Sequence, residues 1–339
     1  MRYIDAFNHF FPKRFFDRMV ALPAGQKDLG KRMMGIPALY DLDLRNEIVD
    51  SFNSAEQQYA QVICLGMPAI DRLVSPEDGP ELARIGNDGL AEICAKDPQR
   101  YPGYAASLAM HNPKEAAREA ERVLAAGANA IQIHTNIDGA AIDGEDLWPL
   151  YEVIEKSGRP ILLHPARTRE MPDFRKEEKS KYEICSVLGW PYETGVALSR
   201  LVFSGIMDKY PDLKVISHHL GGIIPYFEGR IGHSFDQLGA RTSDENYGDI
   251  LKNLKRRPFD YFKGFYGDTA LAGARGPTIC GLSFFGADNV LFASDCPFDP
   301  EKGKGYIRAT IAVIESLDLT AEERAKICHL NAEKMFALS

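Results

Sequence analysis

The sequence has few cysteines for its length, and no two of them form a Cys-x-x-Cys pair. A chain of 339 residues can bury enough apolar surface to fold without disulfide cross-links. We therefore expect reduced thiols and a cytoplasmic protein. The six cysteines are Cys64, Cys94, Cys185, Cys280, Cys296 and Cys328.

Long apolar runs and an excess of positive charge are also missing. No run of about 18 apolar residues occurs, so we expect no membrane span. The first residues carry Asp5 inside an apolar run, which is not the pattern of a signal peptide. Lysine and arginine number 40 against 48 aspartates and glutamates, a net charge of −8. This balance argues against nucleic acid as a partner but leaves room for a local basic pocket that binds a small anion.

No Gly-x-Gly-x-x-Gly motif follows an apolar run, which removes the usual reason to predict an open dinucleotide-binding sheet. Apolar runs instead alternate with helical patterns, for example over 113–126, 145–157 and 194–210. This alternation predicts an α/β fold, a distorted (β/α)8 TIM barrel in one domain over 1–339, in preference to an open doubly wound sheet. The expected strands are 2–7, 59–66, 102–108, 129–134, 160–164, 214–218, 265–269 and 290–294.

Two segments do not fit a regular barrel. Residues 13–56 form a long insert after the first strand, and residues 166–183 are rich in charge. Both follow strands, so both are expected on the rim where a barrel carries its active site. A solvated surface loop is the alternative interpretation of the charged segment.

Histidine or aspartate follows four of the expected strands. His9 ends the first strand, His164 the fifth, and Asp295 the eighth, while His219 follows the sixth. The carboxyl ends of barrel strands meet at one face, so these side chains should converge. Two imidazoles and one carboxylate with open positions form a usable catalytic site for zinc, manganese or iron.

The residues around the sixth and seventh strands leave several roles open. His219 precedes two glycines and is the favoured acid/base residue, while His218 should point the other way if the strand persists. The reverse assignment of the two histidines remains open. Asp268 ends the seventh strand, either in the site or as a helix N-cap. Arg230 could hold a carboxylate through two hydrogen bonds, and His134 ends the fourth strand where it would line the pocket.

At these residues the sequence resembles the amidohydrolase superfamily, and within it the group similar to aminocarboxymuconate semialdehyde decarboxylase. The likeness spans most of the chain and rests on motifs in matching order and spacing. They are Asp5-Ala6-Phe7-Asn8-His9 with Pro12, Leu147-Trp148-Pro149-Leu150-Tyr151-Glu152 followed by His164-Pro165, Tyr210 to Val215 leading to His219-Leu220-Gly221-Gly222, Gly229-Arg230-Ile231, and Ser294-Asp295-Cys296-Pro297-Phe298.

The resemblance implies a lyase with one divalent metal, zinc in the first place and manganese in the second. By this analogy His9, His164 and Asp295 are metal ligands, and His219 is the acid/base residue. The implied reaction is non-oxidative decarboxylation of a small aromatic or unsaturated carboxylic acid. Arg230 matches a family arginine that reaches a neighbouring subunit's substrate, which implies a homodimer.

Phe7 is the departure from the family pattern, because it stands where the motif has a second histidine. Phenylalanine cannot ligate, so the site would bind metal weakly, complete its shell with water or substrate, or bind none. We expect the substrate-binding residues to be Phe7, His134, His218 and Arg230. One alternative is a hydrolase of a carbon–carbon, lactone or amide bond, or a hydratase, with Asp295 as the base. The other is a metal-free or non-catalytic homologue.

Overall fold

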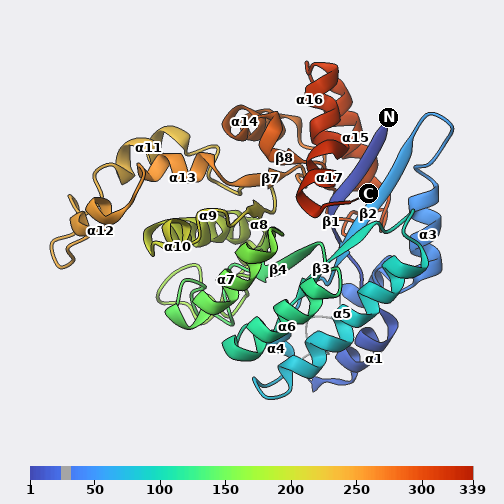
Figure 1. Cartoon of the computed structure of the whole chain (residues 1–339), viewed down its shortest axis with the longest axis horizontal. Helices are drawn as coiled ribbons and strands as arrows, with labels where there is room; N and C mark the ends of the chain where they lie inside the picture. Colours follow the sequence, from blue (N-terminus) through green and yellow to red (C-terminus); the bar gives the residue numbers. More distant parts are fainter. Residues whose placement is uncertain (24–31, 339) are drawn as a thin grey trace.

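Eight parallel strands form the centre of the molecule. The computed structural model describes residues 1–23 and 32–338. The strands pair in chain order from β1 to β8, each parallel to the next, and helices cover them on the outside (Figure 1). The predicted α/β barrel is confirmed. The strands are β1 Arg2–His9, β2 Gln58–Cys64, β3 Gly103–Ser107, β4 Ala130–His134, β5 Ile161–His164, β6 Val215–Ser217, β7 Tyr266–Asp268 and β8 Val290–Leu291.

The barrel is nearly closed by the segment that follows β8. Strand β8 has only two residues, shorter than the predicted 290–294. Beyond it, the backbone N–H of Ala6 donates to the carbonyl of Phe292 over 2.8 Å, and the N–H of Asp295 donates to the carbonyl of Phe7 over 3.2 Å. These bonds bring the two ends of the barrel sheet together. They also place Asp295 beside β1, although the two are at opposite ends of the sequence.

An apolar layer fills the barrel below the strand ends. Side chains two residues apart share one face of a strand. Leu162 and Ile216 belong to the same buried cluster, and Phe336 near the C-terminus packs with them. The same alternation places His164 on the face of Leu162 and His218 on the face of Ile216. The polar residues therefore lie on top of an apolar floor, at the carboxyl ends of the strands.

The helices agree with the sequence patterns except at one place. Helix α6 spans Pro113–Ala125, close to the predicted 113–126, and α7 spans Trp148–Ser157 after a short 3-10 turn. The single helix predicted over 194–210 is wrong. Gly205 has a φ of 82°, so its left-handed backbone ends one helix before the next begins. The two pieces are α9 Gly189–Phe203 and α10 Ile206–Lys209.

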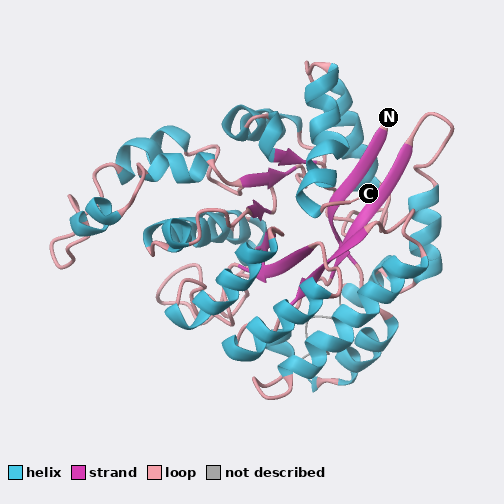
Figure 2. Cartoon of the chain, in the orientation of Figure 1, coloured by secondary structure: helices cyan, strands magenta, loops and turns pink. Residues whose placement is uncertain are grey.

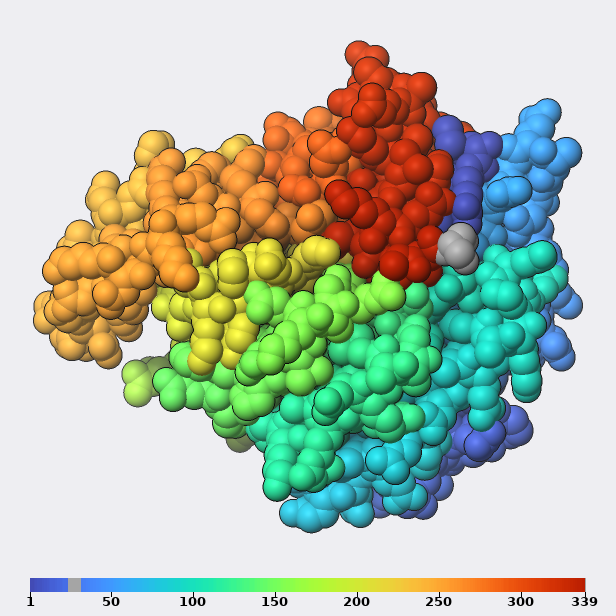
Figure 3. All heavy atoms as spheres, in the orientation of Figure 1, coloured from blue at the N-terminus to red at the C-terminus, as the bar shows by residue number. Residues whose placement is uncertain are grey.

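The remaining helices surround the strands in Figure 2, where helices are cyan and strands magenta. Helices α11 to α13 form a lobe that projects to the left in Figure 3. Among the described residues, no helix is both long and apolar enough to cross a membrane. These helices are α1 Lys13–Ala21, α3 Leu42–Asp50, α4 Ile70–Leu73, α5 Gly79–Lys96, α8 Ile184–Val187, α11 Glu228–Phe235, α12 Gly248–Asn253, α13 Pro258–Lys263, α14 Arg275–Phe285, α15 Gly305–Ser316, α16 Ala321–Ala325 and α17 Asn331–Phe336.

The predicted rim insert over 13–56 contains α1, two 3-10 turns and α3. Its residues 24–31 lie outside the described part of the chain. The charged segment 166–183 forms turns without a helix or strand. Arg72 of α4 holds it through an ion pair of 3.3 Å to Glu170, and it also pairs with Asp138, outside this segment, over 2.8 Å. A contact of either segment with a substrate stays a prediction.

Candidate functional site

Histidine and aspartate side chains from four strands meet at the carboxyl end of the barrel. One imidazole nitrogen each of His9, His164 and His218 lies within 4.8 Å of the others. A second group with the same spacing contains His218, His219 and Asp295. The structure thus brings together the four residues that the sequence singled out as ligands or acid/base group. It also adds His218, which belongs to both groups.

Hydrogen bonds at Nδ1 orient the rings of His9 and His164. The Nδ1 of His9 lies 3.0 Å from the carbonyl oxygen of Leu65, and the Nδ1 of His164 lies 2.6 Å from that of Pro165. A carbonyl can only accept, so each Nδ1 carries the hydrogen, and in the neutral ring Nε2 is left with the lone pair. This arrangement is typical of histidines that bind metals.

His218 is oriented in the same way, but by a carboxylate. Its Nδ1 lies 2.6 Å from Oδ2 of Asp268. The other oxygen, Oδ1, accepts hydrogen bonds of 3.0 Å from the backbone N–H groups of His219 and Ala270. Asp268 therefore anchors the end of β6. The N-cap interpretation of Asp268 is wrong, because the next helix begins only at Arg275.

Phe7 lies among the imidazoles. Its ring stacks on that of His218, with the centroids 4.0 Å apart and the planes inclined by 24°. The centroids of His9 and His164 lie 5.6 Å and 5.8 Å away. Phe7 is fully buried, so its ring supports the histidines from within the barrel. A direct contact between Phe7 and a substrate stays a prediction.

His219 differs from the other histidines of the site. Strand β6 ends before it, and its φ is 56°, so the strand alternation does not apply. Both neighbouring rings consequently approach one carboxylate: Nε2 of His218 lies 3.5 Å from Oδ1 of Asp295, and Nε2 of His219 lies 3.8 Å from Oδ2. Within the described residues, Nδ1 of His219 has no hydrogen-bond partner. His219 therefore lacks the anchor that fixes His218.

The charges of the site depend on one another. Burial alone would raise the pKa of Asp295, but the surrounding histidines hold that pKa well below its ordinary value. Burial disfavours charge on His218, yet Asp268 and Asp295 outweigh it and raise the pKa of His218 to about 10. Burial lowers the pKa of both His164 and His219. The two carboxylates therefore favour the charged form of His218, whereas burial favours neutral rings at His164 and His219.

The donor atoms of the site suit a divalent metal. Buried Nε2 atoms of His9 and His218 have no hydrogen-bond partner among residues 1–23 and 32–338. The Nε2 of His9 lies 3.2 Å from Oδ1 of Asp295, so an imidazole nitrogen and a carboxylate oxygen face the same space. Imidazole and carboxylate ligands of this kind bind zinc or manganese.

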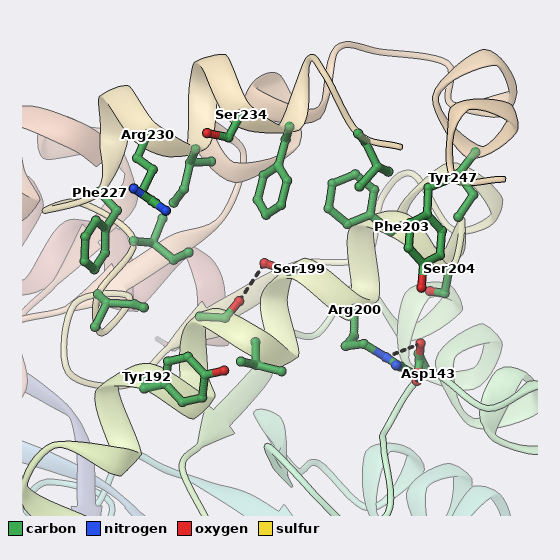
Figure 4. Close-up of a pocket in the computed structure, with 18 of the residues that line it drawn as sticks. Asp143, Tyr192, Ser199, Arg200, Phe203, Ser204, Phe227, Arg230, Ser234 and Tyr247 are labelled. Atoms are coloured by element: carbon green, nitrogen blue, oxygen red, sulfur yellow. Dashed lines mark hydrogen bonds and ion pairs between the residues drawn. The ribbon is translucent and has the colours of Figure 1, made fainter. Parts of the chain in front are cut away.

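His134 and Arg230 take different places from the four central residues. His134 pairs with His164 across β4 and β5, and burial lowers its pKa to about 4, so it lies in the site wall as a neutral ring. Arg230 lines a separate cavity of about 790 Å³ between α9 and α11, together with Tyr192 and Phe227 (Figure 4). The described lining of this cavity includes none of the central histidines. A role of Arg230 in a neighbouring subunit stays a prediction.

Sequence reasoning missed the central position of His218. The sequence did show that His218 lies two residues after Ile216, so that both side chains share one face of an extended strand. A parallel strand, however, is apolar on both faces, so the sequence does not show which face is the inner one. Only the common buried cluster of Leu162 and Ile216 identifies the inner face.

Comparison with known proteins supports the sequence resemblance. The family model described as Amidohydrolase matches residues 68–338. The chain belongs to this family. The matched residues include His164, His219 and Asp295, whereas His9 and Phe7 precede them.

Decarboxylases are among the known relatives of this amidohydrolase-family chain. Gamma-resorcylate decarboxylase from Polaromonas sp. is 31% identical over 286 residues, which cover 82% of this chain and 83% of the relative. The structure of a dihydroxybenzoic acid decarboxylase from Polaromonas sp., with bound manganese and the inhibitor 2-nitroresorcinol, superimposes with a TM-score of 0.76 at 27% identity, over 99% of this chain and 96% of the other. The structure of 5-carboxyvanillate decarboxylase from Sphingomonas paucimobilis, at 24% identity, shares the fold with a TM-score of 0.82 over 100% and 99% of the two chains.

Proposed function

We propose that this protein is a metal-dependent, non-oxidative decarboxylase of a small hydroxylated aromatic acid. The observation that carries the proposal is the cluster of anchored imidazoles and one carboxylate at the barrel end, with the unanchored His219 beside it. The decarboxylases among its relatives support the same reaction and an aromatic substrate.

The proposed cofactor is one divalent metal held by His9, His164 and Asp295. The sequence favoured zinc, with manganese second. The manganese in the dihydroxybenzoic acid decarboxylase from Polaromonas supports manganese instead. When bound, such a metal aligns an oxygen of the substrate and withdraws electron density from the reacting carbon.

His219 is the proposed proton donor to the ring carbon that bears the carboxylate. Its Nε2 faces Asp295 over 3.8 Å, and its other nitrogen has no partner in the part of the chain that the structure describes. Protonation of the ring carbon makes it tetrahedral, and the loss of carbon dioxide then restores aromaticity. The buried ring of His134 helps to exclude water from this space.

Replacement of His219 tests the proposal. We expect the wild-type enzyme with added metal to release carbon dioxide from dihydroxybenzoic acids, and His219→Asn to lower kcat by about 10²–10⁴-fold with unchanged circular dichroism. The control is His233→Asn, since His233 is exposed on α11. Near-wild-type turnover of His219→Asn would remove its assigned role.

Analysis of the product separates the alternatives. Incorporation of labelled water oxygen without release of carbon dioxide would indicate a hydrolase. Absence of turnover with every aromatic acid, in metal-loaded protein, would indicate a non-catalytic homologue.

We also propose a homodimer in the cytoplasm. Exposed apolar side chains on α9 and before α11 support self-association. They include Tyr192 and Tyr226, whose exposed fractions are 55% and 81%. Arg230 lies next to this surface, where it could approach a second subunit.

A further inference from the structure

The proposed metal site lacks a donor at position 7, and a histidine that could supply one stacks directly against that position. We infer that His218, fixed by Asp268, is the metal ligand that takes the place left by Phe7. The ligand set would then be His9, His164, His218 and Asp295. This inference rests on the metal-dependent function proposed above.

The first argument is the position of His218. It is the residue common to both groups of donor atoms. Its Nε2 lies 3.5 Å from Oδ1 of Asp295, the same oxygen that Nε2 of His9 approaches over 3.2 Å. Its side chain is fully buried, and within the described chain its Nε2 has no hydrogen-bond partner. A buried, unpartnered nitrogen is costly unless something binds it.

The second argument is the support behind the ring. Metal-binding histidines almost always donate their other ring nitrogen to a carboxylate or carbonyl. His218 does so toward Asp268 over 2.6 Å, as His9 and His164 do toward backbone carbonyls. Asp268 is itself fully buried and held by two backbone N–H groups. The ring of His218 is therefore fixed with Nε2 toward the other donors.

The third argument is the contact between Phe7 and His218. The two rings stack at 4.0 Å, so the side chain that cannot ligate packs against the one that can. An apolar ring at position 7 fills the space without competing for the metal. The missing donor and the additional donor are thus neighbours in the fold, although they are far apart in the sequence.

The adjacent His219 provides the contrast. Its Nδ1 has no hydrogen-bond partner in residues 1–23 and 32–338, so nothing fixes its ring as Asp268 fixes that of His218. Its side chain is 18% exposed, whereas that of His218 is buried completely. This difference separates a ligand from a proton carrier in two consecutive histidines.

Manganese binding tests the assignment without reference to turnover. Protein stripped with chelator is titrated with Mn²⁺ by calorimetry, and its metal content is measured by elemental mass spectrometry. We expect His218→Ala to weaken Mn²⁺ binding by more than about 100-fold, and Asp268→Asn by about 10–100-fold. The matched control, His219→Ala, should stay within about threefold of wild type.

A second variant tests the link to position 7. The double variant Phe7→His with His218→Ala should recover Mn²⁺ affinity to within about tenfold of wild type. It removes the imidazole at position 218 and supplies another at position 7, whose ring stacks against that of residue 218 in the wild type. Pulsed electron paramagnetic resonance of bound Mn²⁺ should show one coupled histidine nitrogen fewer in His218→Ala. Circular dichroism of each variant checks folding. If His218→Ala does not fold, the Mn²⁺ affinities of Asp268→Asn and of the double variant test the ligand assignment in its place.

The outcomes distinguish this inference from the proposed function. Wild-type Mn²⁺ affinity and nitrogen coupling in His218→Ala would overturn the ligand assignment, and carbon dioxide release by the wild-type enzyme would still support decarboxylation. Loss of Mn²⁺ in His218→Ala would support the assignment even if no aromatic acid released carbon dioxide.

Discussion

Asp5 of β1 shows how one buried carboxylate ties the first strand to the segment that follows the last one. Its Oδ1 accepts from the backbone N–H of Ser294 over 3.0 Å, and its Oδ2 accepts from the hydroxyl groups of Tyr59 and Ser294. Burial raises the pKa of Asp5 from 3.8 to about 6, although these hydrogen bonds act in the opposite direction. The folded protein therefore holds this proton more tightly than the unfolded chain.

This shift predicts a pH effect on stability with a definite sign. The contribution of Asp5 is fully present below its unfolded pKa of 3.8 and is lost as the pH rises through about 6. Relative to Asp5→Asn, the free energy of unfolding of the wild type should fall by about 2 kcal/mol between about pH 4.5 and about pH 7.5. Urea denaturation of both proteins across this pH range measures the difference in their free energies of unfolding. Parallel pH curves would contradict the shifted pKa.

At the scale of elements, α3 supports the site from outside the barrel. Its Arg45 is fully buried. Its guanidinium donates to the carbonyl oxygens of Ala38 and His9 and, over 3.0 Å, to Oε1 of Gln61. One residue of the insert thus joins the insert to the end of β1 and to the middle of β2. Part of segment 13–56 therefore stabilises the strands beneath the site, in addition to its predicted place on the rim.

Removal of this guanidinium should be costly. We expect Arg45→Met to lower the free energy of unfolding by on the order of 3 kcal/mol, because it leaves buried acceptors without a donor. Arg14→Met is the matched control. Arg14 pairs with Glu92 on the surface, where such a pair contributes about 0.2–1 kcal/mol. Equal urea midpoints for the two variants would contradict this role of Arg45.

Helices could be predicted from the sequence where residues at their own ends mark the boundary. The proline at the start of α6 and Gly158 after α7 marked those helices in the sequence. The break between α9 and α10 was missed, because an isolated glycine inside an apolar pattern is compatible with a continuous helix. Strand β8 is short because the chain after it pairs with β1 through isolated bonds, which no local pattern encodes.

At the scale of the whole molecule, an apolar surface lies beside the cavity of Arg230. We define it by Leu188, Tyr192, Val196, Tyr226 and Phe227, which are all exposed. Tyr192, Val196 and Phe227 line the same cavity, and the ring centroids of Tyr226 and Phe227 lie 5.2 Å apart. Neighbouring exposed apolar side chains of this kind mark a contact with another molecule. The proposed occupant is a second copy of this chain.

We expect a dimer with twice the 37.7-kDa mass of one chain in sedimentation analysis. The double substitution Leu188→Asp and Tyr192→Asp should shift the protein to the monomer, since it places charge in an apolar contact. Ile279→Asp is the control, because Ile279 is also exposed but belongs to α14. A wild-type monomer at micromolar concentration would contradict the proposed dimer.

The sequence by itself determined the barrel and most of the residues at its carboxyl end. Alternating apolar and helical segments set the topology, and His9, His164, His219 and Asp295 were visible because each follows a strand. Only the tertiary structure decided which face of β6 points inward and that Asp268 fixes His218. The physical reason is that strand period and end position are local properties, whereas facing direction, ring stacking and anchoring depend on neighbours brought together by barrel closure.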